Sequence, residues 1–331
     1  MKNKYFLGID IAKNYNVATL KDLKVNLDSF RFDNNLQGFQ DLIERVSGKE
    51  VIFGLEATGF YYLPLTFWLK DQGYQVRVIN PLTTKKMAKS NIRKTKTDKI
   101  DSKHLAWMAQ LGEGYPFHES HQSYQLKLLC RHRFFLKRQI ERLKKHNQAL
   151  AFQEVIFTKD KVNFLPDIKG HSEKLIPVLE EQIEDTTKRI LTVAEEIPEI
   201  EYLDSIPGIS TLSACQILAE IGSIERFADA KALVAFAGLD SSTIQSGESR
   251  HSSGKLSKRG SPYLRYYLFH AARGAVKADP ELKEYYLKKE KEGKHYFVRL
   301  AAVSRKLLLR IYRVLKDKRC YVKSPESIDT P

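Results

Sequence analysis

Short apolar runs separated by turn residues fill the first 80 residues, and this pattern restricts the fold more than any other feature. Lys4 to Ile11, Tyr15 to Leu20 and Val25 to Phe32 are typical of an antiparallel meander of strands. A helical stripe over Leu36 to Val46 follows, and then a second apolar run over Val51 to Leu55. The pattern thus changes from strands alone to helix and strand.

The alternation continues beyond that run. Tyr61 to Leu69 has the apolar spacing of an amphipathic helix, and Gln75 to Ile79 is expected to be a buried strand closed by Asn80-Pro81. Strands that alternate with helices predict an α/β domain with a mixed sheet. We place this domain at residues 1–118.

The rest of the chain is dominated by helical patterns. Gln122 to Ile197 carries long ones, interrupted around Pro166 and Gly170, and predicts a helical hairpin or coiled-coil arm at 119–197. Heptad spacing is poor in its first half, so the helix is better supported than the coil. A mainly helical C-terminal domain is expected at 198–320, followed by a polar tail at 321–331.

Within that C-terminal domain, two segments differ from plain helix. The sequence SIPGISTLSACQILAEIG resembles a helix-hairpin-helix, in which the Pro207-Gly208-Ile209 turn offers amides to a phosphate or simply packs. Asp240 to Gly260 is rich in Ser, Gly, Lys and Arg and predicts a loop or short hairpin. Helices are expected again over Pro262 to Val276 and Tyr296 to Leu315.

The net charge favours polyanionic partners. The 331 residues contain 55 Lys and Arg against 40 Asp and Glu, a formal net charge of +15. Nucleic acid is the leading partner class and an anionic membrane surface the second. No run approaches the ~20 apolar residues that span a bilayer, and an early acid interrupts any signal-peptide core, so we expect a cytoplasmic protein, associated with the nucleoid when acting. The three cysteines have no metal-ligand spacing and are expected to be inert.

Four carboxylates are distinguished by position. Asp10 and Glu56 each follow an apolar run, where a strand is expected to end at the edge of a sheet. Asp98 and Asp101 are three apart, which on a helix places them on one face, and Thr97 is a suitable cap. If the two strands are neighbours, all four acids can border one shallow cleft.

Such a cluster suits hard divalent cations. Mg²⁺ prefers oxygen ligands, and two ions ~3.5–4 Å apart can activate a nucleophile and stabilise the leaving oxygen of a phosphodiester. The alternative is that Asp10 and Glu56 are turn residues and that Asp98 and Asp101 neutralise nearby lysines.

Basic residues gather in two segments that are expected to contact nucleic acid, although a solvated basic loop is the alternative for the second. The first contains Lys85, Lys86, Lys89, Arg93, Lys94 and Lys96, and the second contains Lys255, Lys258, Arg259 and Arg265.

The motifs GIDIAK, GLEATG followed by Tyr61 and Tyr62, and TKTDKIDSKHLAWMA resemble the ribonuclease-H-fold nuclease domain, close to the RuvC-like type of Holliday-junction resolvases. Their order and spacing are similar to those of the IS110 family of insertion-sequence transposases. In that family the acids form an Asp-Glu-Asp-Asp tetrad. The resemblance therefore implies catalytic, metal-binding roles in the presence of Mg²⁺ or Mn²⁺ for Asp10, Glu56, Asp98 and Asp101.

A later segment of this chain contains AGL, then QSG, then KLSKRGSPYLR. This order is similar to that in the second domain of the same transposase family. There a serine nucleophile forms a covalent phosphoserine link to DNA, and the match carries this catalytic role onto Ser246. Composition alone does not distinguish it from its neighbours Ser241, Ser242, Ser249, Ser252 and Ser253, for which an ordinary loop serine is the alternative.

The resemblance extends from Lys4 to Leu315 and implies a DNA transposase or recombinase that transfers phosphodiester bonds. It further implies subunits that assemble through the helical arm, as a homodimer or homotetramer, and a structured non-coding bridge RNA that pairs with DNA. Two other functions stay open from the residues: a metal-only junction resolvase or nuclease, and a catalytically inactive nucleic-acid-binding protein.

Overall fold

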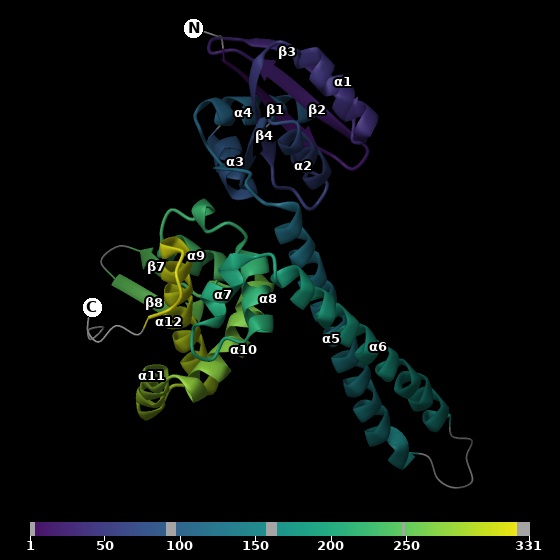
Figure 1. Cartoon of the computed structure of the whole chain (residues 1–331), viewed down its shortest axis with the longest axis vertical. Coiled ribbons are helices and arrows are strands. Elements are labelled where there is room, and N and C mark those ends of the chain that lie inside the picture. Colours follow the sequence, from purple (N-terminus) through teal and green to yellow (C-terminus); the bar gives the residue numbers. More distant parts are fainter. Residues whose placement is uncertain (1–3, 91–96, 157–163, 247–248, 323–331) are drawn as a thin grey trace. The chain divides into compact units, whose positions relative to one another are not determined.

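The computed structural model describes residues 4–90, 97–156, 164–246 and 249–322. The chain forms two compact units, Met1–His118 and Glu119–Pro331, which are seen in Figure 1 and are taken one at a time below. No helix in the described ranges combines the length and the apolar character needed to span a membrane.

A mixed sheet forms the centre of the first unit. Its strands follow the order β3-β2-β1-β4-β5-β6, in which β1, β4 and β5 are parallel to one another and the other neighbours are antiparallel. This topology confirms the mixed α/β sheet expected from the sequence. The strands are β1 (Lys4–Ile11), β2 (Tyr15–Lys21), β3 (Asn26–Asp33), β4 (Glu50–Glu56), β5 (Gln75–Ile79) and β6 (Tyr115–Pro116).

Helices bury both faces of the sheet. Because side chains alternate along a strand, Leu7 and Ile9 of β1 and Phe53 and Leu55 of β4 share one face, where all four are fully buried. Gly8 and Gly54 share the other face, which α4 covers. The helices of this unit are α1 (Leu36–Val46), α2 (Leu63–Asp71), α3 (Pro81–Ser90) and α4 (Asp98–Gln110).

Local sequence signals set where these helices begin. The Asn35 side chain accepts a hydrogen bond from the Gly38 amide at the start of α1, and the Thr97 side chain accepts one from the Ile100 amide at the start of α4. Both residues are good N-caps because their side-chain oxygen satisfies an otherwise unpaired amide of the first turn. The caps agree with the expected starts at Leu36 and Asp98.

Two long helices form the hairpin expected in the second unit. α5 (His121–Gln153) and α6 (Leu165–Ala194) lie side by side (Figure 1). The interruption expected around Pro166 and Gly170 lies earlier: α5 ends at Gln153, and Pro166 is in the first turn of α6. Proline is tolerated there because the amide it lacks has no partner within the helix.

The base of the α5–α6 hairpin and the C-terminal helices share one core, across the boundary expected at residue 197. Leu126 and Cys130 of α5 and Ile190 of α6 are buried in the same cluster as Leu218 of α8. Packing between distant segments, which no local pattern predicts, explains the difference. The remaining elements are α7 (Pro198–Asp204), α8 (Thr211–Ile221), α9 (Ala230–Ala237), β7 (Ser241–Ser246), β8 (Ser249–Leu256), α10 (Pro262–Ala278), α11 (Pro280–Lys291) and α12 (Tyr296–Asp317).

Burial explains the state of two of the three cysteines. Cys130 and Cys215 are buried, and their desolvation raises the pKa of both thiols, that of Cys215 to about 12. A thiol that stays protonated is a poor nucleophile and metal ligand. Cys320, by contrast, is exposed.

Candidate functional site

Asp10 and Glu56 are aligned on neighbouring parallel strands. The register pairs Gly8 with Gly54 and Ile9 with Leu55, so the next residues, Asp10 and Glu56, lie beside each other at the carboxyl ends of β1 and β4. Aligned residues on adjacent strands project to the same face. Both acids are half-buried, and they occupy the face that α4 covers.

The helix α4 runs across this face in contact with the strand backbones. The positions that a Cβ would take at Gly8 and Gly54 are filled by α4 between Ser102 and Ala109. On the next strand, the Thr19 hydroxyl, opposite Gly8, is 2.8 Å from that of Ser102. The sequence GID and the glycine of GLE thus allow the helix to approach the sheet closely.

Asp98 and Asp101 lie at the same end of the sheet as Asp10. They precede Ser102 and Leu105, which face the sheet, by four residues each, so they share that side of the helix. The Tyr15 hydroxyl, just past the end of β1, is 3.5 Å from Oδ2 of Asp98. The fold therefore places all four carboxylates at the end of the sheet where β1 and β4 terminate.

Two hydroxyl groups hold the carboxylate of Glu56. Thr58 donates to Oε1 at 2.7 Å, and Thr84 of α3 donates to Oε2 at 2.6 Å. Each oxygen keeps a further lone pair for another ligand. Thr84 is in the first turns of α3. Its hydrogen bond to Glu56 therefore holds the start of α3 beside the Glu56 carboxylate.

The four side chains Asp10, Glu56, Asp98 and Asp101 are all carboxylates, and they lie at the same end of the sheet. Carboxylate oxygens are the ligands that a hard divalent cation prefers. No three of the described Asp, Glu, His or Cys side chains lie close enough together to hold a metal ion. Neighbouring carboxylates repel one another unless a cation lies among them. Binding an ion would therefore require these side chains to turn toward each other.

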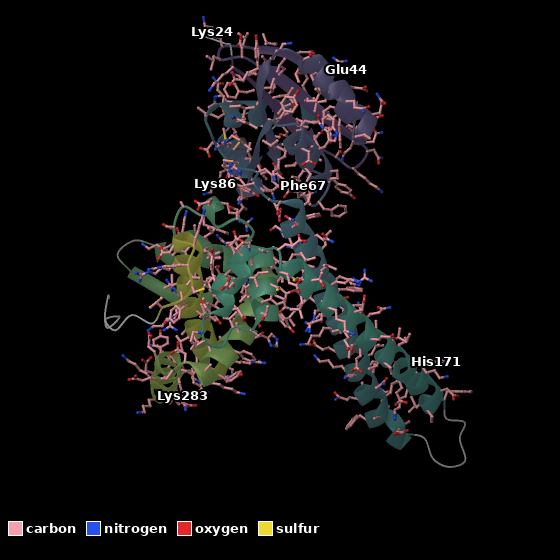
Figure 2. The ribbon with its side chains drawn as sticks, viewed as in Figure 1. Lys24, Glu44, Phe67, Lys86, His171 and Lys283 are labelled. Carbon is pink, nitrogen blue, oxygen red and sulfur yellow. The ribbon has the colours of Figure 1, made fainter. Side chains whose placement is uncertain are left out.

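The first basic segment is only partly described. Lys85 and Lys86 of α3 are exposed, and Lys86 is labelled in Figure 2. The side chain of Lys89 lies outside the described residues, as do Arg93, Lys94 and Lys96. Lys85 and Lys86 directly follow Thr84, which is hydrogen-bonded to Glu56. Two cationic residues therefore lie close in the chain to a residue that contacts one of the four carboxylates.

In the second unit, Ser246 is the last residue of β7 and pairs in register with Ser249 of β8. Of the two structures expected for Asp240 to Gly260, the short hairpin is the one observed. Only the backbone of residues 241–246 and 249–255 is described, so the side chains of Ser246 and Lys255 lie outside the description. Ser246 stands at the turn end of the hairpin.

The base of the hairpin is tightly anchored. The Ser257 amide donates to the Asp240 carbonyl at 3.0 Å, and the Ser261 amide donates to that of Phe236 at 2.8 Å. Gly260 has φ +89°, and a Cβ there would come within 2.0 Å of the same Phe236 oxygen. Only glycine fits this position.

Two of the basic residues expected near the serine are at this base. Arg259 is exposed. Arg265 of α10 donates to the carbonyl of Ala237 at 3.0 Å, which holds its guanidinium against the end of α9. The hairpin thus emerges from a rigid, positively charged base.

The turn at Pro207-Gly208-Ile209 serves packing. Gly208 has φ +88°, and a Cβ there would lie 2.3 Å from the Cα of Ala275 in α10. The Ile209 amide donates to the Ile206 carbonyl at 3.0 Å within the turn, so it is not open to a phosphate. Of the two alternatives for this motif, packing is the one the structure supports.

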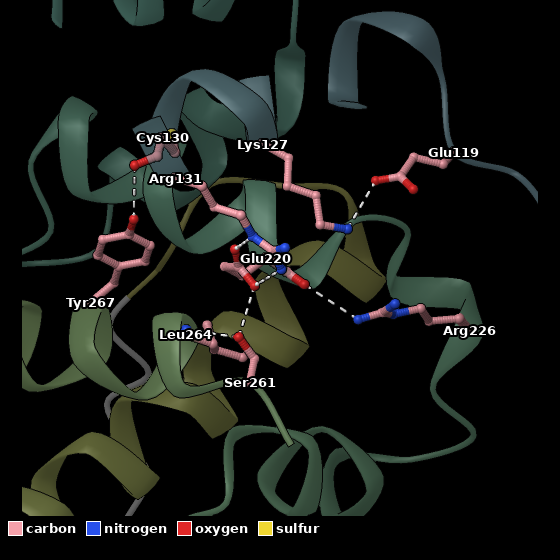
Figure 3. A network of polar contacts seen from close by, with 9 residues as sticks. All are labelled: Glu119, Lys127, Cys130, Arg131, Glu220, Arg226, Ser261, Leu264 and Tyr267. Carbon is pink, nitrogen blue, oxygen red and sulfur yellow. Dashed lines mark hydrogen bonds and ion pairs between the residues drawn. The ribbon is translucent and has the colours of Figure 1, made fainter. Parts of the chain in front are cut away.

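A buried ion pair missed by the sequence analysis connects three helices (Figure 3). Glu220 of α8 is 1% exposed. Its Oε1 is 2.7 Å from Nε of Arg131, while its Oε2 accepts from Nη2 of Arg131 at 3.1 Å and from the Ser261 hydroxyl at 2.7 Å. Ser261 caps α10 just after the hairpin. One acid within the apolar stripe of α8 was the only sequence signal.

Comparisons with known proteins match both units. A family model described as the transposase IS116/IS110/IS902 family matches residues 200–287, and a transposase model of the IS110 DEDD type matches residues 7–155. The chain is 29% identical to the pilin gene-inverting protein of Moraxella lacunata over 97% of this chain and 98% of that protein. It is 34% identical to the transposase for insertion sequence element IS1111A of Coxiella burnetii over 30% of this chain and 27% of that protein.

Among solved structures, Thermus thermophilus RuvC in complex with a Holliday-junction substrate overlaps 34% of this chain and 99% of its own chain, with 14% identity and a TM-score of 0.26. Overlap at this level supports no conclusion about function.

Proposed function

The chain belongs to the IS116/IS110/IS902 family of transposases, and we propose that it recombines DNA through a serine nucleophile and a metal site in its first unit. Asp10, Glu56, Asp98 and Asp101 would hold the metal, and Ser246 would attack the DNA. The observation that carries the proposal is the alignment of Asp10 with Glu56 under the acidic start of α4.

A divalent metal supplies Lewis-acid stabilisation of the charge that builds on phosphate and leaving oxygens. The residues of the chain would do the rest. Thr58 and Thr84 orient Glu56, Tyr15 lies beside Asp98, and the close packing of α4 on Gly8 and Gly54 keeps the helix in place.

In the proposed reaction, Oγ of Ser246 forms a bond to a backbone phosphorus and loses its proton, and the strand oxygen leaves as a free hydroxyl group. The phosphoserine ester keeps the strand end ready for rejoining to a second strand. Arg259 at the base of the hairpin would neutralise phosphate charge near the serine. Support for Ser246 comes from the family resemblance and from its place at the hairpin turn.

The substrate proposed is the DNA of an insertion sequence. The name of the Moraxella relative says that it inverts the pilin gene, and we propose that the present chain also rearranges DNA. We further propose a structured RNA as guide, assembly into a dimer or tetramer through α5 and α6, and action in the cytoplasm on nucleoid DNA. The net charge of +15 suits both kinds of nucleic acid.

A plasmid recombination assay with the element ends tests the metal site. Asp10→Asn removes one carboxylate charge at nearly constant shape, and we expect recombination to fall at least about 100-fold. Glu44→Gln is the matched control, because Glu44 is exposed on α1 (Figure 2). Equal recombination by the Asp10→Asn variant and the wild type would refute the metal site.

The same assay tests the nucleophile. Ser246→Ala should abolish recombination, because alanine has no oxygen to bond to phosphorus. Ser249→Ala is the matched control, since it pairs with Ser246 in the same hairpin and should recombine normally. Recombination by the Ser246→Ala variant would reject the serine mechanism.

A further inference from the structure

A groove of about 1380 Å³ lies in the second unit, outside the residues discussed as catalytic. Its walls come from α10 and α12, with Tyr285 of α11 at one side. Leu256 and Lys258, at the base of the serine hairpin, complete the lining. Because this volume exceeds the roughly 300–1,000 Å³ of ordinary small-molecule pockets, the groove has room for more than a single small ligand.

The charge of the groove has one sign. Among the lining residues that the structure describes there is no Asp or Glu, whereas five are cationic: Lys258, Arg265, Arg273, Arg305 and Lys306. Arg273 and Arg305 are exposed. Lys306 lies 4.3 Å from the centre of the Tyr285 ring and 3.7 Å from Glu281, which stands outside the lining. A ligand of this groove is therefore expected to be anionic.

Between the cations the lining is aromatic and apolar. It includes Tyr266, Phe269, His270, Tyr285 and Phe297. Phe297 is 57% exposed, so its ring is accessible to a ligand. Flat rings that alternate with positive charges suit a ligand that is itself flat, apolar on its faces and regularly anionic.

His270 contributes an aromatic ring to the lining of the groove. Burial and the nearby cations Lys137 and Arg273 lower the pKa of His270, which favours the neutral imidazole. Its ring centre is 4.4 Å from that of Tyr266. The two rings are tilted by 58°, so they add aromatic surface in two orientations, and the anion would be held by the arginines and lysines.

We propose that this groove binds a single-stranded stretch of the DNA substrate, with unstacked bases on its aromatic side chains and phosphates on Arg273, Arg305 and Lys258. Single strands are bound in this way because every base has a face for stacking, which a duplex conceals. The inference rests on the proposed function for the identity of the substrate. Lys258 follows the serine hairpin directly, so a strand in the groove would approach the hairpin that carries Ser246.

Binding is tested with the full chain and a fluorescein-labelled 12-nucleotide single-stranded DNA, by fluorescence anisotropy in EDTA at several salt concentrations. The variants are Phe297→Ala and Arg305→Gln. We expect Phe297→Ala to weaken binding about tenfold, as for loss of one stacked base, and Arg305→Gln to reduce the salt slope by about 0.7. Leu36→Ala and Arg45→Gln, at exposed positions of α1, are controls that should bind as the wild type does.

Several outcomes would overturn the inference. The first is wild-type DNA affinity in both groove variants. The second is a loss of affinity for single-stranded RNA or duplex DNA of the same sequence, with the affinity for single-stranded DNA unchanged. The third is a changed oligomeric state in light scattering without a change in DNA affinity. The last result would assign the groove to a second copy of the chain. Since binding needs neither metal nor Ser246, a failure here leaves the recombination tests standing, and a failure of those tests leaves the measured binding intact.

Discussion

Gly8 of β1 touches the backbone of Ala106 in α4: a Cβ built on Gly8 would lie 2.0 Å from the Ala106 amide nitrogen. The contact is possible only because glycine has no side chain. It sets the height of α4 above the sheet, and with it the position of Asp98 and Asp101 relative to Asp10.

Gly8→Ala should therefore displace α4 and impair both stability and recombination. The neighbouring atoms are helix backbone and cannot move individually, so we expect a destabilisation of about 1–3 kcal/mol or more, as for overpacking of a core. Thermal unfolding and the plasmid assay measure the two effects.

Gly170→Ala is the matched control. Gly170 lies inside α6 with nothing near its absent Cβ, and alanine should stabilise the helix by about 0.5–1 kcal/mol. Similar behaviour of the two variants would contradict the close packing of α4 on Gly8.

The buried pair of Glu220 with Arg131 should be important for the stability of the second unit. Glu220→Ala leaves the guanidinium and the Ser261 hydroxyl without their acceptor, and removal of one partner of a buried pair costs about 3–5 kcal/mol. Because Arg131 is 42% exposed, we expect the lower end of this range. Urea unfolding followed by circular dichroism measures it.

Glu180→Ala serves as the control for Glu220. Glu180 pairs with Lys144 at 3.2 Å, and both side chains are more than half exposed, so its loss should cost about 0–1 kcal/mol. Equal losses for the two glutamates would show that burial of Glu220 contributes nothing.

A pH dependence is expected from Asp279, which links α10 to α11. Burial alone would raise its pKa, but the hydrogen bond from Arg310 and those from the amides of Leu282 and Glu281 outweigh burial and hold the pKa below the usual 3.8. A lowered pKa in the folded state stabilises the fold above the unfolded pKa, and this contribution is lost as the pH falls through the folded value.

Asp279→Asn should therefore unfold at a lower temperature than the wild type at pH 7, and the difference should shrink below about pH 4. Asp185→Asn, at an exposed position of α6, controls for the loss of one charge. A difference that stays constant from pH 7 to pH 3 would show that Asp279 is not held as a carboxylate by Arg310.

Sequence patterns predicted the first unit closely because its elements are locally marked. The apolar run over Lys4–Ile11 predicted β1, and Thr97 was expected as the cap of α4. The register between β1 and β4 could not be read from the sequence, yet it is what aligns Asp10 with Glu56. Register follows from packing on both faces of the sheet, which involves residues far apart in the chain.

The second unit was harder to predict for the same reason. Nothing local to Glu220 indicates that Arg131, 89 residues earlier, approaches it. The role of Gly208 depended on α10, which follows more than fifty residues later and leaves no room for a side chain there. Motif resemblance selected Ser246 among several serines, and its assignment stays a prediction.

If Ser246 attacks DNA with the help of the four carboxylates, a covalent protein-DNA adduct forms and can be isolated. Purified protein is mixed with the element-end DNA, with any guide RNA encoded beside the gene, and with Mg²⁺, then denatured and resolved by electrophoresis. We expect an adduct that mass spectrometry maps to Ser246 and that is absent from Ser246→Ala, Asp10→Asn and EDTA samples. Strand cutting by Ser246→Ala without any adduct would contradict this mechanism and identify a metal-only nuclease.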